Sequence, residues 1–415
     1  MTHFRKLTAM VFLLSSALAA GLPAQERMTL QQFIDEAVRS SPAVQIVGEA
    51  VAGAELKVRE AKSLSLPQVS LASSYTRISL TSEFDVPGMG HFKFSTPDNL
   101  NFRLGATEPV FTWGRIAKSV EMGRIGTSIA EDNVVLTKQT LAYQIVPIFY
   151  GVLFTREAVK VVDQTLDLLA KKLATLEERY KAGLASDFDL SLIKVQMSGL
   201  EAQKLDFENN VRKMFMAYNR VAGRPLDATF EPVGELKLEP VTADAQTLTA
   251  EAAAGRPEAK QVADQRRLVQ AQMALARAGD KPSVLAAFNY QLQNGFLPSV
   301  NRIKGYWNAA LAVSVPVFDG RRTSAQVAQS EVALRTVDEQ AADLTTSFDL
   351  EIRQTLADLK TLELKIGIEK TKIAHAERAL QIADERYQNG LISTTDLVEA
   401  QDSLDSARLN YLQLI

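Results

Sequence analysis

The chain has 415 residues, of which 46% are hydrophobic and 23% charged, with a formal net charge of −3 and no cysteine. These fractions argue against wholesale disorder, and the near-neutral charge gives no reason to expect a nucleic-acid partner. The lack of cysteine excludes disulfide scaffolds, thiolate metal sites and a cysteine nucleophile. Since the chain has only three histidines, we expect no cofactor, no metal site and no catalytic site.

Residues 1–24 have the pattern of a secretory signal peptide. Arg5 and Lys6 precede an apolar run over residues 7–20, and small residues follow. The run is shorter than the roughly 20 residues that a helical membrane span needs, and no other stretch of the chain is as apolar over such a length. We therefore expect an exported protein without a membrane-spanning helix.

The first half of the mature chain, residues 25–222, is predicted to begin with a helix and two strands. The strands fall at about 67–82 and 98–112, where apolar side chains occupy alternate positions and give one apolar and one polar face. Strands of this length can cross a bilayer as tilted barrel strands, which need about 9–11 residues. A soluble sandwich with one wet face remains an alternative.

A very long helix is predicted over 115–181. Glycine is rare there, Pro147 is the only proline, and Leu, Ala, Glu and Lys are frequent. At about 1.5 Å per residue the helix is roughly 100 Å long, too long to be buried in one globular core. We expect Pro147 to bend the helix, because proline lacks a backbone donor.

The long helix is expected to turn sharply and return as a second helix over 187–222. Gly183 stands where a left-handed residue ends a helix. Ser186 and Asp189 have the spacing of a capping box at the start of the next helix. The sequence thus predicts an antiparallel helical hairpin with a tight tip.

Residues 223–247 carry three prolines and are predicted to form an irregular equatorial linker. The same order of elements is then predicted in residues 248–415: a helix, strands at about 282–294 and 305–318, a long helix over 321–388 and a return helix over 394–415.

The two halves also match in sequence. Residues 178–190 recur as 385–397 with eight of thirteen positions identical, an offset of 207 residues, and two Pro-Val-Phe triplets have the same offset. The first half is eight residues longer at one place, between Pro67 and Pro109. These landmarks indicate a tandem duplication, with the extra residues in a surface loop.

The predicted fold class is mainly α with a small β part, in which each half supplies one long helical hairpin and two strands. Four strands cannot close a barrel, and a membrane tolerates no open sheet edge. If the strands span lipid, neighbouring chains must supply the rest, and three chains would give about twelve strands, enough to enclose a lumen.

The signal peptide, the duplicated half, the paired strands, the long helices and the Arg-Tyr-x-x-Gly-Leu tips together resemble the TolC-like outer-membrane efflux family over about residues 29–415. The resemblance implies a homotrimer whose twelve-stranded barrel, in outer-membrane lipid, continues as an α-helical tunnel into the periplasm of a Gram-negative cell. It implies a passive exit duct of a tripartite efflux or type I secretion system, with a periplasmic adaptor protein and an inner-membrane transporter as partners. It implies no enzyme.

The resemblance carries over three sets of residues. The first set corresponds to the hairpin tips that contact the adaptor: Ala182, Gly183, Leu184, Asn389, Gly390 and Leu391. An ordinary helix C-cap with a local hydrophobic contact is the alternative, and the two roles are compatible.

The second set is Asp396 and Glu399, which match positions that line the periplasmic constriction of the tunnel. They are three residues apart and so share one helix face. In a trimer they would surround one axis with carboxylates and attract cations. The alternatives are helix capping for Asp396 and a solvated acid for Glu399.

The third set is Tyr387 and Asp189, which match a pair that can hydrogen-bond between the hairpins and hold the tip closed. A second such link in the family uses a basic residue, where this chain has Ile392. We expect that second link to be absent.

Two other protein classes remain open on the sequence. A periplasmic adaptor also contains a helical hairpin, but normally one hairpin flanked by small β domains. A coiled-coil surface protein would not duplicate strand pairs. An enzyme is the least favoured class, since no convergent catalytic residues are found.

Overall fold

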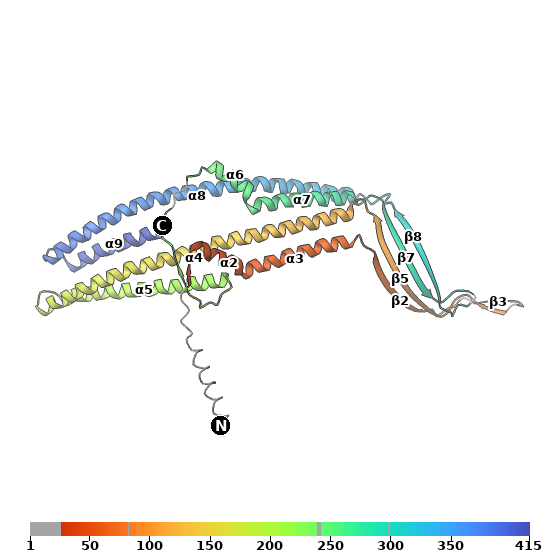
Figure 1. The fold of residues 1–415 in the computed structure, drawn as a ribbon, viewed down its shortest axis with the longest axis horizontal. Coiled ribbons are helices and arrows are strands. Elements are labelled where there is room, and N and C mark those ends of the chain that lie inside the picture. Colours follow the sequence, from red (N-terminus) through yellow and green to blue (C-terminus); the bar gives the residue numbers. More distant parts are fainter. Residues whose placement is uncertain (1–25, 82, 89, 239–241, 298) are drawn as a thin grey trace, which may run out of the picture. The chain divides into compact units, whose positions relative to one another are not determined.

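The structure is a computed structural model that describes residues 26–81, 83–88, 90–238, 242–297 and 299–415. The predicted signal peptide, residues 1–24, lies outside the described residues. The elements shown in Figure 1 are, in chain order, β1 (Glu26–Met28), α2 (Leu30–Ser40), α3 (Pro42–Ser63), β2 (Gln68–Arg77), β3 (Glu83–Val86), β4 (Gly90–Lys93), β5 (Asp98–Phe111), α4 (Arg115–Lys181), α5 (Asp187–Val221), β6 (Phe230–Pro232), α6 (Ala245–Gly255), α7 (Pro257–Arg277), β7 (Ser283–Gln293), β8 (Lys304–Ser314), α8 (Arg322–Gln388) and α9 (Thr394–Leu414).

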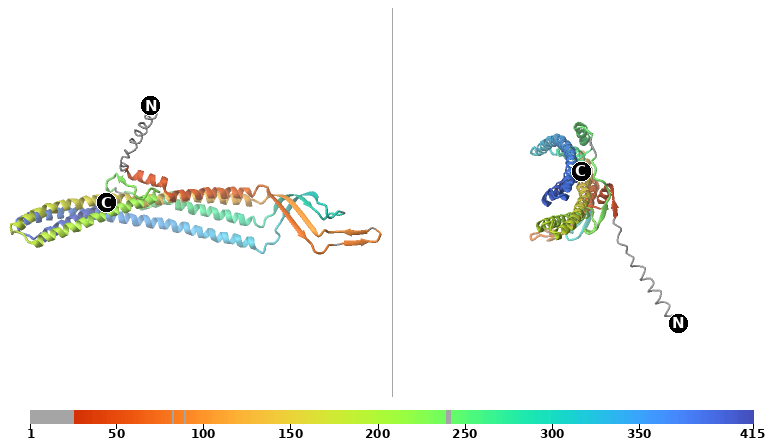
Figure 2. Two further views of the ribbon diagram at one scale, coloured as in Figure 1. Left: turned by 90° about the horizontal axis from the view of Figure 1, so that it is seen from below. Right: turned by 90° about the vertical axis from the view of Figure 1, so that its left-hand side faces the viewer.

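One order of elements occurs twice along the chain: two helices, two long strands, a very long helix and a return helix. The first set is interrupted by the β3–β4 hairpin, which lies between β2 and β5 and extends past the ends of these strands (Figure 2). In the second set, residues 294–303 alone connect β7 to β8. The extra residues of the first half therefore lie in a hairpin rather than in a loop without regular structure.

The four long strands predicted from the sequence are present as β2, β5, β7 and β8, and the described residues form four further strands that were not expected. The four additional strands, β1, β3, β4 and β6, have only three or four residues each, too few for an alternating pattern to stand out in the sequence. β6 and the start of α6 also fall within residues 223–247, so that the linker is not irregular throughout. β6 pairs in parallel with β1.

The four long strands form one antiparallel sheet in the order β2-β5-β7-β8. The register brings the alternating apolar residues of all four strands to one face, which we call the apolar face. Leu71 pairs with Leu104, Leu104 with Tyr290, and Tyr290 with Trp307. The side chains of this face are open to the surroundings, since Leu71 is 77% and Trp307 65% exposed.

The opposite face of the sheet, which we call the polar face, carries Ser70, Asn289 and Asn308 in one row across the strands. β2 and β8 are the two edge strands, and every residue of both is exposed. Within the described part of the chain, neither edge pairs with a further strand.

The chain divides into two compact units. One comprises residues 47–135 and 251–348 and contains the four-stranded sheet, and the other comprises the described residues up to 46 together with 136–250 and 349–415. α4 and α8 contribute residues to both units and have 67 residues each, which is about 100 Å of helix. α4 continues through Pro147.

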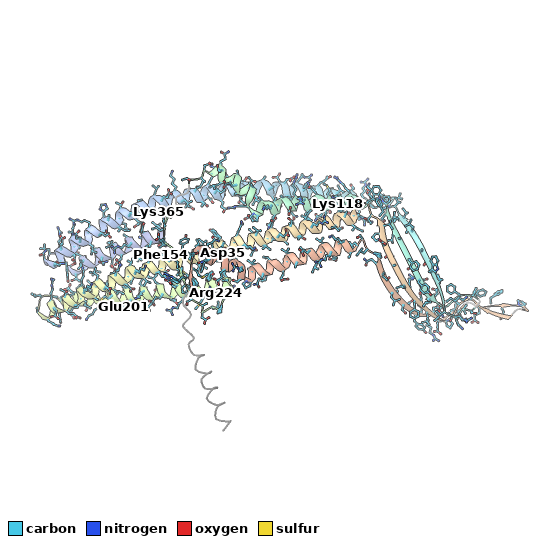
Figure 3. All side chains as sticks on the ribbon, viewed as in Figure 1. Asp35, Lys118, Phe154, Glu201, Arg224 and Lys365 are labelled. Atoms are coloured by element: carbon cyan, nitrogen blue, oxygen red, sulfur yellow. The ribbon has the colours of Figure 1, made fainter. Side chains whose placement is uncertain are left out.

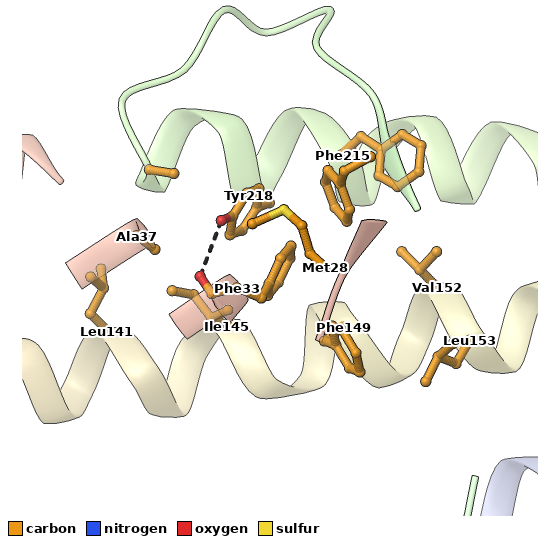
Figure 4. Packing of buried hydrophobic residues seen from close by; sticks show 12 residues of the cluster. Met28, Phe33, Ala37, Leu141, Ile145, Phe149, Val152, Leu153, Phe215 and Tyr218 are labelled. Atoms are coloured by element: carbon orange, nitrogen blue, oxygen red, sulfur yellow. Dashed lines mark hydrogen bonds between the residues drawn. The ribbon is translucent and has the colours of Figure 1, made fainter. Parts of the chain in front are cut away.

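The core of the second unit forms where α2, α4, α5 and β6 meet (Figure 4). The rings of Phe33 and Tyr218 stack with their centroids 3.6 Å apart, and Phe230 packs against both. The Tyr218 hydroxyl donates to the Phe33 carbonyl oxygen at 3.1 Å, and burial raises the pKa of this phenol. Nearby, the Arg224 guanidinium (Figure 3) donates to the Glu36 carboxylate at 2.9 Å.

α4 and α5 pack against each other along a regular seam. The buried residues Val162, Leu169 and Leu176 of α4 recur every seven positions and form one cluster with Leu190 and Ile193 of α5. A seven-residue repeat keeps one face of a helix toward its partner, as in a coiled coil. This seam holds the first hairpin together up to its tip.

Candidate functional site at the hairpin tips

Both long helices end in the same turn geometry. Gly183 and Gly390 have φ angles of 74° and 71°, in the left-handed region that glycine enters without a steric cost. The N–H groups of Leu184 and Leu391 each donate to the carbonyl oxygen five residues earlier, at 2.8 and 2.9 Å. This bond is typical of the Schellman motif, so the C-cap role considered for these residues is present at both tips.

The six predicted tip residues, Ala182, Gly183, Leu184, Asn389, Gly390 and Leu391, are all exposed. Leu184 is 77% and Leu391 72% exposed. The two leucines therefore project apolar surface from the turns instead of filling a local hydrophobic contact.

The return helices α5 and α9 begin with capping boxes at equivalent positions. The Asp189 N–H donates to the Ser186 hydroxyl at 3.2 Å, and the Ser186 N–H donates back to the Asp189 carboxylate at 3.3 Å. Ser393 and Asp396 repeat this exchange at 3.2 and 2.9 Å. The serine hydroxyl is the main cause that lowers the pKa of each aspartate.

Tyr387 and Asp189 lie close to one buried hydroxyl. Thr394, the first residue of α9, is 4% exposed, and its hydroxyl oxygen lies 3.5 Å from that of Tyr387, within hydrogen-bond distance. After Ser186, a hydrogen bond from Thr394 is the next cause that lowers the pKa of Asp189. No direct hydrogen bond between Tyr387 and Asp189 is found in the described structure. Thr394 lies between them and was not identified in the sequence analysis.

Asp396 and Glu399 are both exposed on α9. The Asp396 carboxylate is engaged in the cap, whereas no hydrogen bond or ion pair of the described residues engages the Glu399 side chain. The carboxyls of Asp402 and Asp405 continue the same three-residue spacing along the helix. Burial is the main cause that raises the pKa of both of these groups.

Several polar contacts join the hairpins α4–α5 and α8–α9. The Lys172 ammonium donates to the Asp384 carboxylate at 2.8 Å, with 16% of the lysine side chain exposed. The Gln196 amide donates to Asp402 at 2.5 Å, and the Thr165 hydroxyl donates to Asp405 at 2.9 Å. Their sequence separations exceed 200 residues, which hides such pairs from local pattern analysis.

The described residues contain no group of three or more His, Cys, Asp or Glu side chains that could hold a metal ion. None of the helices in the described ranges has the length and apolar character that a membrane span requires.

The profile of the family described as "Outer membrane efflux protein" matches residues 33–223 and 248–414. The two matched segments cover most of the chain. The chain belongs to the outer membrane efflux protein family. It is accordingly an outer-membrane protein of an efflux system, a class made of channel proteins rather than adaptors, surface fibres or enzymes.

Several characterised efflux proteins are similar to this family member in sequence. It is 22% identical over 325 residues to the pyoverdine export outer membrane protein OpmQ of Pseudomonas aeruginosa, a match that covers 76% of the chain and 67% of OpmQ. It is 21% identical over 405 residues to the outer membrane protein TolC of Escherichia coli, with 92% of the chain and 80% of TolC covered. The cation efflux system protein CusC of Escherichia coli is 22% identical over 398 residues, with 92% and 84% covered.

Solved structures of this fold are similar over nearly the whole chain. The outer membrane protein VceC of Vibrio cholerae has a TM-score of 0.74 at 20% identity, with 93% of the chain and 92% of VceC covered. The CmeC outer membrane channel of Campylobacter jejuni has a TM-score of 0.74 at 15% identity, with 93% and 82% covered. The chain therefore has the fold of these two outer-membrane proteins.

Proposed function

We propose that this chain is one of three subunits of a channel through the outer membrane, and that the channel is a passive exit duct in a tripartite pump. In this proposal an inner-membrane transporter supplies the energy and a periplasmic adaptor protein connects it to the channel. OpmQ, named for pyoverdine export, and CusC, named for cation efflux, show that relatives of this chain serve different cargoes.

The observation that carries the proposal is the sheet β2-β5-β7-β8, with one exposed apolar face and two edges that pair with no further strand among the described residues. An apolar face favours contact with lipid tails, where each side chain the size of leucine gains about 2 kcal/mol on leaving water. Unpaired backbone groups cannot face lipid, so β2 of one chain must pair with β8 of the next. Three chains close such a ring with about twelve strands, which leaves room for a lumen.

In the same proposal the two hairpins form the wall of an α-helical tunnel in the periplasm, and their tips contact the adaptor. Leu184 and Leu391 support this role, because each presents a large apolar side chain next to a glycine turn. Such a projection fits a groove between the helices of a partner.

Asp396 and Glu399 are proposed to line the narrow periplasmic end of the tunnel. In a trimer they place up to six carboxylates around one axis, and such a ring favours cations. Because the cap already engages Asp396, Glu399 is expected to contribute more to the selectivity.

The experiment is a planar-bilayer measurement on the purified protein. The wild-type chain is expected to form a channel whose reversal potential in a KCl gradient indicates cation preference at the tunnel end. The double substitution Asp396→Asn with Glu399→Gln should lower the cation-to-anion permeability ratio at least twofold. The matched control is Glu201→Gln, a change of an exposed acid on α5 (Figure 3).

A chain that forms no channel would contradict the proposed function as a whole. A channel whose reversal potential is the same in the double variant would contradict only the acidic constriction.

A further inference from the structure

The polar face of the four-stranded sheet carries positive charge without a compensating acid. Over the paired rows of the four strands, the charged residues on this face are Arg103 of β5 and Lys304 of β8, and no described position on it is Asp or Glu. The acids of these strands, Asp98 and Glu108, belong to the other face. A polar face that needed only solubility would be expected to mix both signs of charge.

Arg103 is held in place by the strands beside it. The register aligns it with Gln291 of β7 and Tyr306 of β8 in one row. With its amide oxygen turned toward β5, Gln291 accepts from Nε and Nη2 of the guanidinium, and its nitrogen donates to the Tyr306 hydroxyl. Gln291 is only 7% exposed, so this anchor is part of the packed sheet.

The rest of the guanidinium remains open. Arg103 is exposed, and no ion pair joins it to a carboxylate among the described residues. A guanidinium has five N–H donors, of which Gln291 engages the one on Nε and one of the two on Nη2. The outward donors keep the planar fork that binds carboxylate and phosphate groups with two parallel hydrogen bonds.

Lys304 stands in the next row of the same face, where the register pairs Asn101 with Gln293 and Gln293 with Lys304. Its ammonium lies 5.9 Å from the centroid of the Phe296 ring. This contact leaves the positive charge uncompensated, because an aromatic ring carries no net charge.

We propose that Arg103, supported by Lys304, is an anion-recognition site on the wall of the barrel, and that it selects cargo bearing carboxylate or phosphate groups. The proposal rests on the proposed function, in which the polar face lines the lumen and three chains place three Arg103 side chains around it. Convergent fixed charges of one sign in a confined passage raise the local concentration of the opposite ion.

The test uses inorganic pyrophosphate as the probe in planar bilayers. Pyrophosphate should block the conductance of the wild-type channel, and the substitution Arg103→Gln should weaken this block at least tenfold. Lys304→Gln should weaken it less. Arg103→Lys keeps the charge but not the fork and should retain an intermediate block. This result would show that the weaker block of Arg103→Gln is not caused by misfolding.

The matched control is Arg77→Gln, since Arg77 lies at the end of β2 on the apolar face and is already paired with Asp98 at 3.5 Å. This variant should be blocked like the wild type. Equal block of the wild type and of Arg103→Gln would overturn the inference while leaving the channel in place. A wild-type chain without any channel would overturn the proposed function and this inference with it.

Discussion

Thr394 is a buried residue through which the two hairpin tips are in contact. It is buried at the first position of α9, bonded to Tyr387 of α8, and it lowers the pKa of Asp189 of α5. The hydroxyl thus connects the two residues that the family resemblance pairs directly. A carboxyl with a lowered pKa contributes its stabilisation above its ordinary pKa and loses it as the pH falls through the lowered value.

We predict that Thr394→Val opens the tip. Valine has nearly the same shape but lacks the hydroxyl, and the loss of about 1 kcal/mol of hydrogen bonding would shift the open-to-closed ratio roughly fivefold. Single-channel conductance at neutral pH should therefore rise. Thr361→Val is the control, because the exposed Thr361 hydroxyl bonds only to a carbonyl of its own helix. A conductance that does not change in Thr394→Val would rule out this link as a latch.

At the scale of the elements, α4 meets α9 through a buried polar cluster in which one partner is missing. The Asp405 carboxylate accepts from Thr165 at 2.9 Å and from Gln401 at 3.0 Å. The side-chain oxygen of Gln401 is buried without a hydrogen bond within the described structure. Burial raises the pKa of Asp405 more than its hydrogen bonds lower it. Its stabilising contribution is therefore complete below the ordinary pKa and is lost as the pH rises through the raised value.

We predict that Asp405→Asn stabilises the contact at neutral pH. A neutral amide can donate to the unpaired oxygen of a rotated Gln401, and it avoids burying a charge. At pH 7.5 the free energy of unfolding should increase by about 1 kcal/mol, and the thermal unfolding midpoint should rise with it. The difference from the wild type should vanish near pH 4. The control Asp358→Asn changes an exposed acid of α8 and should show neither effect. A lower midpoint at pH 7.5 would mean that the charge is needed.

Some elements of the fold can be predicted from the sequence and others cannot. Glycine at 183 and 390 and the serines at 186 and 393 specify where a helix must end and the next begin, since each turn has a backbone requirement of its own. The β3–β4 hairpin and the β1–β6 pair could not be predicted, because strands of three or four residues have no readable period. Thr394 and Lys172 could not be recognised either, as their partners lie on other helices and depend on tertiary packing.

At the scale of the whole molecule, the four-stranded sheet is not closed by any strand that the structure describes in one chain. Its four strands have an exposed apolar face and two edges without a partner strand in the described ranges, which is the geometry of part of a barrel wall. The proposed lumen, the acidic constriction and the anion site on the barrel wall all require copies of the chain to close that wall. All three therefore require that β2 of one chain associates with β8 of the next.

Cross-linking in intact outer membranes tests this claim most directly, since the chain has no cysteine of its own. Ser73→Cys on β2 and Ala309→Cys on β8, combined in one chain and treated with a short bis-maleimide, should give a ladder that ends at three chains. The control pair Thr107→Cys and Ala287→Cys faces across β5 and β7 inside one chain and should remain monomeric. A ladder with three bands from the edge pair is the predicted result. A single monomer band from the edge pair would contradict the account.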